Sequence, residues 1–324
     1  MRTERDTAMR SVRDFGAIGD GMTDDSKSFQ RVTGYLGSRG GGTLLVPDGA
    51  FVISRTVELP SRVSLQMTPG ATIKASARFD GEAVVQTVTA DEPYEDQRIL
   101  GGTIDGSGLN VIGLRVHHAC RALIGDLLVK NALRKGIHIG VGKGYEVNVR
   151  NVWCRVEAGV KASAGSIGLH YDSFGDSLVT GVVIIGYETC LRSDSYSNDF
   201  HLVHVWNHQD NCPLATCFYC NGWNDSYSQC YADSPINGDQ PGYGFYVARP
   251  NTRIMGCRVF CNSYATAERV TGVFIADGAT GGCYVGNHFM ANEGHEMKMA
   301  FDGNLEGAYI AGNSYAPTVK GGKK

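Results

Sequence analysis

Short segments of similar sequence recur at nearly constant spacing along most of this chain. Residues 256–259, 282–285 and 307–310 read GCRV, GCYV and GAYI, so they follow one another at steps of 26 and 25 residues. Related segments continue the series toward the N-terminus at steps of 22 to 30 residues, beginning near residues 102, 125, 151, 181, 203 and 229. A fixed period of this length predicts a repeat architecture in which each repeat stacks on the next.

Each repeat contains a second short segment that alternates apolar with polar or aromatic residues. These second segments begin at Gly113, Gly136, Gly168, Cys190, Cys217, Gly244 and Gly272. Such alternation is typical of half-buried strands rather than helices. Because like positions recur in phase, the strands should stack in parallel, which predicts an all-β fold: a single-stranded right-handed parallel β-helix with coils about 4.8 Å apart. The inward positions would be Leu114, Ile137, Leu169, Leu191, Phe218, Phe245 and Val273.

The composition agrees with a chain rich in turns and excludes several other classes. Glycine makes up 43 of 324 residues, about 13% against a usual level of about 7%. The formal net charge of −3 gives no basic surface for nucleic acid. Apolar runs such as residues 179–185 stop far short of a membrane span. We therefore expect no nucleic acid and no membrane as partners, and the charged N-terminal residues predict no secretory signal.

The cysteines are expected to be free, buried thiols. Ten cysteines in a chain of this length are too few for a disulfide scaffold. Cys217 and Cys220 form a Cys-x-x-Cys pair without a second pair at zinc-site spacing, so a structural zinc ion is not expected. Cys230, Cys257 and Cys283 lie 27 and 26 residues apart, which predicts a column of stacked thiols inside the coils.

The N-terminal segment carries a recognisable order of motifs. Residues 11–56 contain Asp-Phe-Gly-Ala, Gly-Asp-Gly and Thr-Asp-Asp, then a helical stretch and Val-Pro-Asp-Gly. This order resembles the opening of the pectate-lyase-like superfamily of β-helix proteins, which includes polysaccharide lyases, glycoside hydrolases and bacteriophage tailspike depolymerases. The resemblance implies a polysaccharide substrate, an extracellular or virion-associated location and, for tailspike relatives, a homotrimer.

The chain departs from the pectin-degrading members of that superfamily. It lacks the ordered Asn-Thr-Asp, Asp-Asp, Gly-His-Gly and Arg-Ile-Lys series of polygalacturonases, for which residues 293–296 (EGHE) are no substitute. It also lacks the calcium-binding and Trp-Ile-Asp-His signatures of pectate lyases. Pectin is therefore not the expected substrate.

We expect residues 1–324 to form one β-helix domain. Its predicted parts are an N-terminal extension, a cap with the first coil, the remaining coils and a flexible basic tail, at residues 1–12, 13–56, 57–316 and 317–324. Asp24 and Asp25 directly precede a helical stretch, where carboxylates are favoured. This helix would cover the open end of the coil. Asp20, Asp24 and Asp25 are accordingly interpreted as structural.

The residues that follow the inward positions predict polar columns on one face of the solenoid. The first column holds Arg115, His138, His170, Arg192, Tyr219 and Tyr246. A second column, two positions further on, holds Asp172, Asp194, Asn221 and Ala248. Phe174, Tyr196 and Trp223 follow at the next turn and could stack on sugar rings. A line of cations, carboxylates and aromatic rings suits an extended glycan.

Asp172 and Asp194 are the strongest catalytic candidates. On neighbouring coils their backbones would lie about 4.8 Å apart, and carboxyl groups about 5–5.5 Å apart suit a retaining glycosidase. Like charge would raise the pKa of one carboxyl, which places an acid beside an ionised partner. The alternative is that both aspartates merely begin turns. A ladder of turn residues is the favoured interpretation for Asp176, Asp199 and Asp225.

β-Elimination would use the first column instead. A lyase needs a cation that neutralises a uronate carboxylate and a base that takes the adjacent proton. Arg192 with His170, or Arg192 with Tyr219, supplies these groups. The role of His170 depends on the register of residues 154–170, where extra length would also allow residues 159–162 to take the place of residues 168–171.

No cofactor or dedicated metal site is predicted, apart from an adventitious calcium ion. His201, His204 and His208, together with Asp210, have a spacing that suits metal binding on a helix. The repeat makes this segment a strand and a turn, and side chains alternate between faces along a strand, so His201 and His204 would diverge. Two further acids at the ends of first strands, Asp105 and Asp233, rank below Asp172 and Asp194.

The paired aspartates favour a glycoside hydrolase, and the resemblance implies that it degrades an extracellular or capsular polysaccharide in a tailspike-like setting. The alternative is a polysaccharide lyase that cleaves a uronate-containing glycan by β-elimination. A second alternative is a non-catalytic glycan-binding or virion attachment module, in which the columns bind sugar and the aspartates only cap turns. The fold alone does not decide among them.

Overall fold

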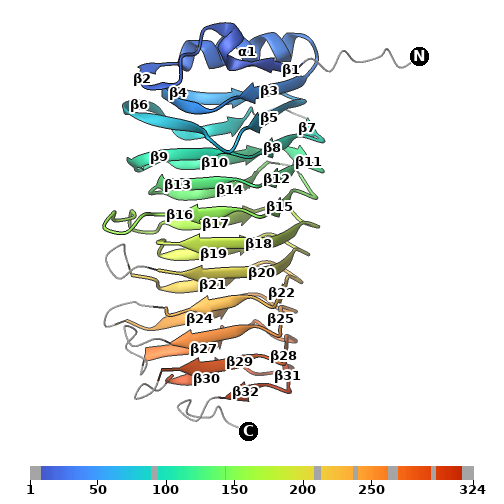
Figure 1. Cartoon of the computed structure of the whole chain (residues 1–324). Coiled ribbons are helices and arrows are strands. Elements are labelled where there is room, and N and C mark those ends of the chain that lie inside the picture. The colour runs from blue at the N-terminus through green and yellow to red at the C-terminus, as the bar shows by residue number, and fades with distance from the viewer. Residues whose placement is uncertain are drawn as a thin grey trace, which may run out of the picture.

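The protein is a solenoid of stacked coils (Figure 1). The structure, a computed structural model, describes residues 9–88, 94–142, 144–207, 213–235, 240–261, 269–292 and 297–315. Strands of the solenoid pair in parallel with strands of the coils before and after them. The predicted right-handed parallel β-helix is therefore confirmed.

The strands form three columns along the axis. The first column contains β1 (Met9–Ser11), β3 (Gly42–Val46), β5 (Val63–Met67), β8 (Arg98–Leu100), β12 (Leu123–Gly125), β15 (Asn148–Arg150), β22 (Ser226–Ser228), β25 (Arg253–Met255), β28 (Cys283–Val285) and β31 (Tyr309–Ala311). The second contains β2 (Asp20–Asp24), β4 (Gly49–Leu59), β6 (Ala71–Thr87), β9 (Thr103–Leu109), β13 (Leu128–Ala132), β16 (Trp153–Arg155), β23 (Tyr231–Asp233), β26 (Arg258–Cys261), β29 (His288–Ala291) and β32 (Ser314–Tyr315). The long strands β18 (Leu178–Ile185) and β20 (Asp199–Trp206) span the first two columns.

The third column carries the predicted site. It begins on the distal parts of β4 and β6 and continues through β10 (Ile112–His117), β14 (Lys135–Val141), β17 (Ile167–Asp172), β19 (Thr189–Asp194), β21 (Thr216–Cys220), β24 (Gly242–Val247), β27 (Val270–Ile275) and β30 (Met299–Gly303). A separate two-stranded sheet pairs β7 (Tyr94–Glu95) with β11 (Ala119–Cys120). Since β17 pairs with β14 and β19, residues 168–171 hold the place predicted for them, and residues 159–162 lie outside the strands.

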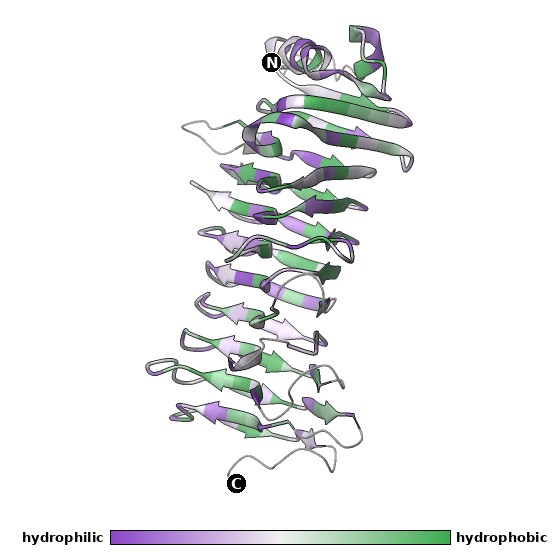
Figure 2. Cartoon of the chain, turned by 90° about the vertical axis from the view of Figure 1, so that its left-hand side faces the viewer, coloured by the Kyte–Doolittle hydropathy of each residue, from purple (hydrophilic) through white to green (hydrophobic). Residues whose placement is uncertain are grey.

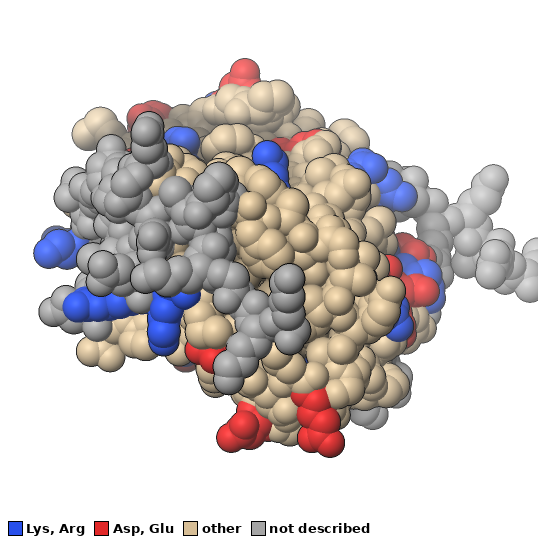
Figure 3. All heavy atoms as spheres, turned by 90° about the horizontal axis from the view of Figure 1, so that it is seen from below, with Lys and Arg blue, Asp and Glu red and all other residues tan. Residues whose placement is uncertain are grey.

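The interior of the coil is apolar. Hydrophobic and polar residues alternate along the strands (Figure 2), and the charged side chains visible from the C-terminal end lie around the circumference (Figure 3). The seven predicted inward residues of the third column are all fully buried and lie in register, confirming the prediction: Leu114, Ile137, Leu169, Leu191, Phe218, Phe245 and Val273. Burial of each such side chain contributes about 1.5–3 kcal/mol.

Buried polar side chains link the turns between the third and first columns. Ser177 Oγ accepts from the Val147 N–H (3.1 Å), Asn198 Oδ1 from the Ser177 N–H (3.0 Å), and Asp225 Oδ1 from the Asn198 N–H (2.9 Å). These bonds satisfy backbone donors that would otherwise be buried without partners. The predicted ladder is therefore correct for Asp225 only. Asp176 and Asp199 lie directly before Ser177 and directly after Asn198, because the turns differ in length.

The described cysteines are all free thiols. Cys230 and Cys257 stack as predicted, with the Cys230 N–H donating to Cys257 Sγ at 3.3 Å. Cys283 does not continue this column, and that prediction was wrong. It begins β28 and pairs with Arg253, whereas Asn287 follows Cys257 in the column and accepts its N–H at 2.9 Å.

A helix covers the N-terminal end of the solenoid (Figure 1). α1 (Ser26–Ser38) follows the short 3-10 helix η1 (Val12–Phe15) and buries Phe29, Val32 and Leu36 on one face. The buried Asp25 directly before α1 accepts the N–H groups of Ile18 and Gly19, at 2.7 and 3.0 Å. Asp20 and Asp24 also accept local hydrogen bonds, which agrees with their structural interpretation. No helix in the described part of the chain is long and apolar enough to cross a membrane.

Candidate active site

The third column presents its outward residues in line along the axis. They are, in register on successive coils, Arg115, His138, His170, Arg192, Tyr219 and Tyr246. The register places the predicted cations and aromatic rings on one face. Asp172 and Asp194 pair at the ends of β17 and β19, as predicted from the repeat.

Asp194 is the centre of a hydrogen-bonded cluster. Its Oδ2 accepts from Arg192 Nε at 2.5 Å and lies 2.8 Å from His170 Nε2. Its Oδ1 accepts from Arg192 Nη2 at 3.1 Å and from Asn221 Nδ2 at 2.7 Å. Burial would raise the pKa of Asp194, but the hydrogen bonds from His170, Arg192 and Asn221 hold it well below its usual range. Asp194 is therefore an ionised anchor that fixes the groups around it.

Both ring nitrogens of His170 are engaged. Lys135 Nζ lies 2.8 Å from Nδ1, and Asp194 Oδ2 lies 2.8 Å from Nε2. Because an ammonium group only donates and an ionised carboxylate only accepts, His170 is neutral with its proton on Nε2. Burial lowers the pKa of His170, in agreement with this state. Both nitrogens of His170 are thus engaged, and the ring links Lys135 to Asp194, while its role as the base stays a prediction.

Lys135, at the start of β14, is the member of the cluster that sequence analysis missed. Burial lowers its pKa to about 8, although the charge of Asp172 opposes this shift. In register with Lys135 lie Ile112 and Ile167, both buried, so the column looks apolar. A lysine between isoleucines on the two adjacent coils was the signal available in the sequence. An amine of this pKa is partly neutral at mildly alkaline pH.

His138 is buried against His170. The two rings are nearly parallel, with centroids 4.8 Å apart. His138 is 8% exposed, and neither of its ring nitrogens has a hydrogen-bond partner among the described residues. Asp172 Oδ2 is an electrostatic neighbour, 3.5 Å from Nε2. Burial, together with Lys135 and His170, lowers the pKa of His138 to about 3, so the ring is neutral.

Asp172 and Asp194 differ in their surroundings, although they pair on neighbouring coils. The Asp172 side chain is 40% exposed, and its Oδ1 accepts from Ser173 Oγ at 3.0 Å. The Asp194 side chain is 17% exposed and is held by three partners. Asp172 is thus the carboxylate that faces solvent, and Asp194 is the carboxylate that organises the cluster.

The described residues include one group whose atoms could surround a metal ion. Ligand atoms of His138, His170 and Asp172 lie within 4.8 Å of one another. However, the Lys135 ammonium group occupies His170 Nδ1, and Asp194 occupies its Nε2. A metal ion would have to displace one of these partners and would lie close to the Lys135 charge. The donor set therefore does not fit a resident metal.

The predicted binding residues at the two ends of the column have different partners. Arg115 forms an ion pair with Glu82 at 2.6 Å. The Arg192 guanidinium lies over the Tyr219 ring, 4.7 Å from its centroid, a favourable cation–π arrangement. Tyr246 stacks on Tyr219 with ring centroids 5.2 Å apart.

Two of the three aromatic residues predicted at the next turn are exposed. Tyr196 and Trp223 are 41% and 55% exposed and form a parallel bridge between neighbouring coils. Phe174 is fully buried, so its predicted role in stacking on sugar was wrong. The residue under Tyr196 is Gly175, where an added Cβ would lie 2.1 Å from the Tyr196 ring. The turn therefore points Phe174 inward and leaves room for Tyr196 on the surface.

The histidines of β20 diverge, as predicted. His201 lies in the part of β20 that belongs to the first column, and His204 lies in the part that belongs to the second, where it stacks on Tyr231 with centroids 4.6 Å apart. The remaining members of that series, His208 and Asp210, lie outside the described residues.

The lower-ranked acids Asp105 and Asp233 lie in the second column rather than in the cluster. Asp105 Oδ2 is 3.4 Å from Lys130 Nζ. Asp233 Oδ2 is 3.9 Å from His204 Nε2. Neither aspartate belongs to the third column, which holds Asp172 and Asp194.

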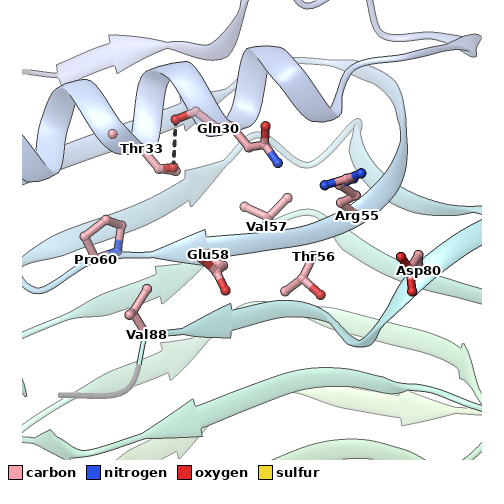
Figure 4. A pocket seen from close by; sticks show the side chains of 10 residues that line it. Gln30, Thr33, Arg55, Thr56, Val57, Glu58, Pro60, Asp80 and Val88 are labelled. Atoms are coloured by element: carbon pink, nitrogen blue, oxygen red, sulfur yellow. Dashed lines mark hydrogen bonds between the residues drawn. The ribbon is translucent and has the colours of Figure 1, made fainter.

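Two cavities lie away from the cluster. One, of about 550 Å³, lies beneath α1 and is lined by residues that include Gln30, Arg55 and Glu58 (Figure 4). The other, of about 560 Å³, lies between the first and second columns beside Leu128 and Trp153. Neither is lined by a member of the cluster. The cluster is built on the outward residues of the third column, and a line of such residues suits a polymer better than a small molecule.

The N-terminal third of the chain matches a known protein family. Residues 9–112 match the family model described as “Rhamnogalacturonase A/epimerase, pectate lyase-like”. This match confirms the resemblance carried by the motifs of residues 11–56.

Several named proteins match this chain over similarly short stretches. Plasmin and fibronectin-binding protein A of Streptococcus pneumoniae is 32% identical over 114 residues, which are 32% of this chain and 16% of the relative. Mannuronan C5-epimerase AlgE4 of Azotobacter vinelandii is 33% identical over 91 residues, 28% of this chain and 15% of the relative. The preneck appendage protein of Bacillus phage PZA is 42% identical over 102 residues, 30% of this chain and 11% of the relative. The matches thus span less than a fifth of the length of these relatives.

Solved structures share the fold over nearly the whole chain. A surface adhesin of Streptococcus pneumoniae has a TM-score of 0.75 at 14% identity, covering 95% of this chain and 85% of that chain. The tailspike protein of E. coli bacteriophage HK620, in complex with a pentasaccharide, has a TM-score of 0.65 at 12% identity, covering 97% of this chain and 66% of that chain. Likeness at these identities shows the fold alone.

Proposed function

We propose that this chain, a parallel β-helix with a pectate-lyase-like N-terminal region, acts on a uronate-containing polysaccharide by removing the proton next to the uronate carboxylate. The observation that carries the proposal is the continuous series of contacts from Lys135 through His170 and Asp194 to Arg192. This series holds an amine and a guanidinium group on one open face, as proton abstraction beside a carboxylate requires.

In the proposed first step, the neutral amine of Lys135 takes the C5 proton of the uronate. A neutral amine can still donate to His170 Nδ1, so its lone pair remains available for this proton. The electrons left at C5 delocalise into the carboxylate, and Arg192 stabilises the developing charge. Arg192 binds Asp194 through Nε and Nη2, which fixes the guanidinium group. We assign Nη1, which takes no part in these two bonds, to the substrate.

Two products can follow from this intermediate. If the C4–O4 bond breaks, its electrons leave with O4, a C4=C5 double bond forms, and the glycan is cleaved by β-elimination. Tyr219, under Arg192, is the candidate donor of the proton that O4 then takes up. If a proton instead returns to C5 from the opposite face, C5 is inverted without cleavage. The relatives named as mannuronan C5-epimerases support the inclusion of this second outcome.

Deuterium exchange at C5 tests the step common to both outcomes. The protein is incubated in D₂O with a panel of polyuronates and uronate-containing capsular polysaccharides. Exchange is followed by NMR, unsaturated uronate by ultraviolet absorbance, and new reducing ends by a colorimetric assay. We expect C5 exchange that is lost in Lys135→Met and kept in Lys130→Met, a matched variant in the second column. A glycan that binds but shows neither exchange nor unsaturated product would contradict the proposal.

Hydrolysis is a second candidate, favoured by the pairing of Asp172 and Asp194 on neighbouring coils. Asp194, whose pKa is lowered, would be the ionised partner, and the solvent-facing Asp172 would be the acid. Reducing ends without unsaturated uronate, lost in Asp172→Asn, would support this candidate. Binding without any product would instead indicate an attachment module.

The relatives also support a proposed setting for this activity. The preneck appendage protein belongs to a Bacillus phage, and the HK620 tailspike is seen with a pentasaccharide. We therefore extend the proposal to recognition of an extracellular polysaccharide by a virion-associated homotrimer. Light scattering on the purified protein tests the trimer directly, since it measures the mass of the assembly.

A further inference from the structure

The outward residues of the third column change character along the axis. On the coils of β10, β14, β17 and β19 they are Arg115, His138, His170 and Arg192. On the next four coils they are Tyr219, Tyr246, Phe274 and Asp302. His138 and His170 are neutral, so the positive charges of the first four strands are those of Lys135, Arg192 and Arg115, the last of which is paired with Glu82. We call the coils of β10–β19 the cationic part of the face, and those of β21, β24 and β27 the aromatic part.

The cationic part has unused capacity to bind a polar ligand. Lys135 adds a positive charge beside His170, and Arg192 binds Asp194 through Nε and Nη2, so we assign its Nη1 group to a further acceptor. His138 has two buried ring nitrogens without hydrogen-bond partners among the residues that the structure describes. Burying such groups without a partner costs free energy. Sugar hydroxyl groups beside a carboxylate would satisfy the imidazole of His138 and the cations together.

The aromatic part is a connected cluster of half-buried rings. Tyr219 and Tyr246 have centroids 5.2 Å apart, and those of Tyr246 and Phe274 are 5.1 Å apart. Tyr243 packs edge-on against Tyr246 at 5.2 Å. β21, β24 and β27 contain no lysine or arginine. Apart from the Arg192 guanidinium over the Tyr219 ring, these strands therefore offer a carboxylate ring edges and phenolic hydroxyl groups but no positive charge.

We propose that the glycan is a heteropolysaccharide that places its uronate on the cationic part and uncharged sugars on the aromatic part. This inference rests on the proposed function and specifies its substrate class. A sugar chain along the axis advances by roughly one residue per coil, because the coils are about 4.8 Å apart. A homopolymer of uronates would thus place a carboxylate over the coils of Tyr246 and Phe274, whose strands contain no cation, and the carboxylate would lose water there without gaining a charged partner. The next coil would add repulsion from Asp302.

Uncharged sugars suit the aromatic part for two reasons. Their C–H groups can pack against the ring edges that the stacked rings leave open, and their hydroxyl groups can bond to the phenols of Tyr219 and Tyr246. The turn beside this part adds Trp223, which is 55% exposed, and the neighbouring turn adds Tyr196. The change from cations to rings therefore defines a direction for the bound glycan, with its uronate toward the N-terminal end.

Binding measured against chain length tests the inference. Oligogalacturonates of increasing length are compared by calorimetry with aldouronic acids, in which one glucuronate is attached to a chain of neutral xylose residues. We expect affinity for oligogalacturonates to stop rising once the chain exceeds the four coils of the cationic part. Affinity for aldouronic acids should continue to rise with added xylose. A continued rise for the oligogalacturonates, or no dependence on added xylose, would overturn the inference.

A charge placed in the aromatic part provides the second test. Phe274→Lys should tighten binding of long oligogalacturonates by about two- to fivefold and weaken binding of long aldouronic acids. Phe274→Leu, which stays apolar, should leave the oligogalacturonates unchanged. If Phe274→Lys alters the oligomeric state but neither affinity, the rings form a contact between copies of this chain, and the inference is wrong. C5 exchange is measured separately from binding. If affinity depends on glycan length as expected but no C5 exchange occurs, the proposed function is contradicted and this inference is not.

Discussion

Lys135 should give the reaction a distinctive dependence on pH. Burial lowers its pKa to about 8, although the charge of Asp172 opposes this shift. If the neutral amine takes the C5 proton, the rate follows the neutral fraction of Lys135. That fraction is about a tenth at pH 7, about half at pH 8 and about nine-tenths at pH 9. The value of kcat/KM should therefore rise about fivefold from pH 7 to pH 8 and less than about twofold from pH 8 to pH 9.

The assay is the initial rate of deuterium incorporation at C5, measured at constant ionic strength because salt screens the nearby charges. Lys135→Met should lower kcat by about 10²–10⁴ and abolish the rise with pH. Lys135→Arg keeps the positive charge but cannot supply a neutral base. Its kcat should therefore fall while its KM stays near the wild-type value, and this difference separates proton abstraction from substrate binding.

Two results would refute this reasoning about Lys135. One is a rate that stays constant or falls between pH 7 and pH 9, and the other is a Lys135→Arg variant that keeps the wild-type profile. Asp172→Asn supplies an independent check. Because it removes the charge that raises the pKa of Lys135, it should shift the rise in rate to lower pH.

Three further predictions concern the cluster, the buried ladder and a turn. Asp194→Asn should lower kcat/KM by about 10- to 100-fold, because the charge-assisted bonds that fix the guanidinium group are weakened. A variant with the activity of the wild type would show that Asp194 has no role in the reaction. Burial raises the pKa of Asp225 from 3.8 to about 6, so its stabilising contribution is present below pH 3.8 and is lost as the pH rises through about 6. Urea unfolding should show that the free energy of unfolding falls by about 3 kcal/mol over this range in the wild type and not in Asp225→Asn, since a pKa difference of one is worth about 1.36 kcal/mol. An equal fall in both proteins would contradict the prediction. Gly140→Ala should lower the midpoint of thermal unfolding more than Gly159→Ala. Both glycines have positive φ, but only a Cβ at Gly140 would collide with a neighbour, 1.4 Å from the Asp172 carbonyl oxygen. Equal midpoints for the two variants would show that this clash is relieved.

The fold was predictable because a solenoid repeats its own geometry. Once the strand beginning at Gly113 was aligned with those beginning at Gly136 and Gly168, one inward position identified all the others. Burial of Leu114, Ile137 and the rest follows from that single alignment. The same alignment also placed Asp172 opposite Asp194.

Predictions failed where the chain leaves the strands. Turns vary in length from coil to coil, so residues counted from the preceding strand lose their phase. This explains why Phe174 points inward and why Cys283 lies in a different column from Cys257. Asp176 and Asp199 miss the buried ladder by one residue for the same reason.

The contacts within the cluster were not predictable from the register. Column positions specify which backbones are neighbours, but hydrogen bonds depend on the length and rotamer of each side chain. Lys135 stands in line with two buried isoleucines, yet its amine reaches His170 Nδ1. That contact engages one nitrogen of His170, the residue that the sequence predicts as the base.

The cationic and aromatic parts of the third column lie on different coils, and this separation has a consequence for partial unfolding. In a solenoid each coil contacts only its neighbours, so opening can proceed from one end without disrupting the remainder. Opening from the C-terminal side would release β27 and β24, with Phe274 and Tyr246, before it reached the coils of Lys135 and Arg192. Mild denaturation or proteolysis at that end should therefore shorten the stretch of glycan that the protein binds, while Lys135 and Arg192 stay in place. Processivity on long polymers should then be lost before turnover of short ones.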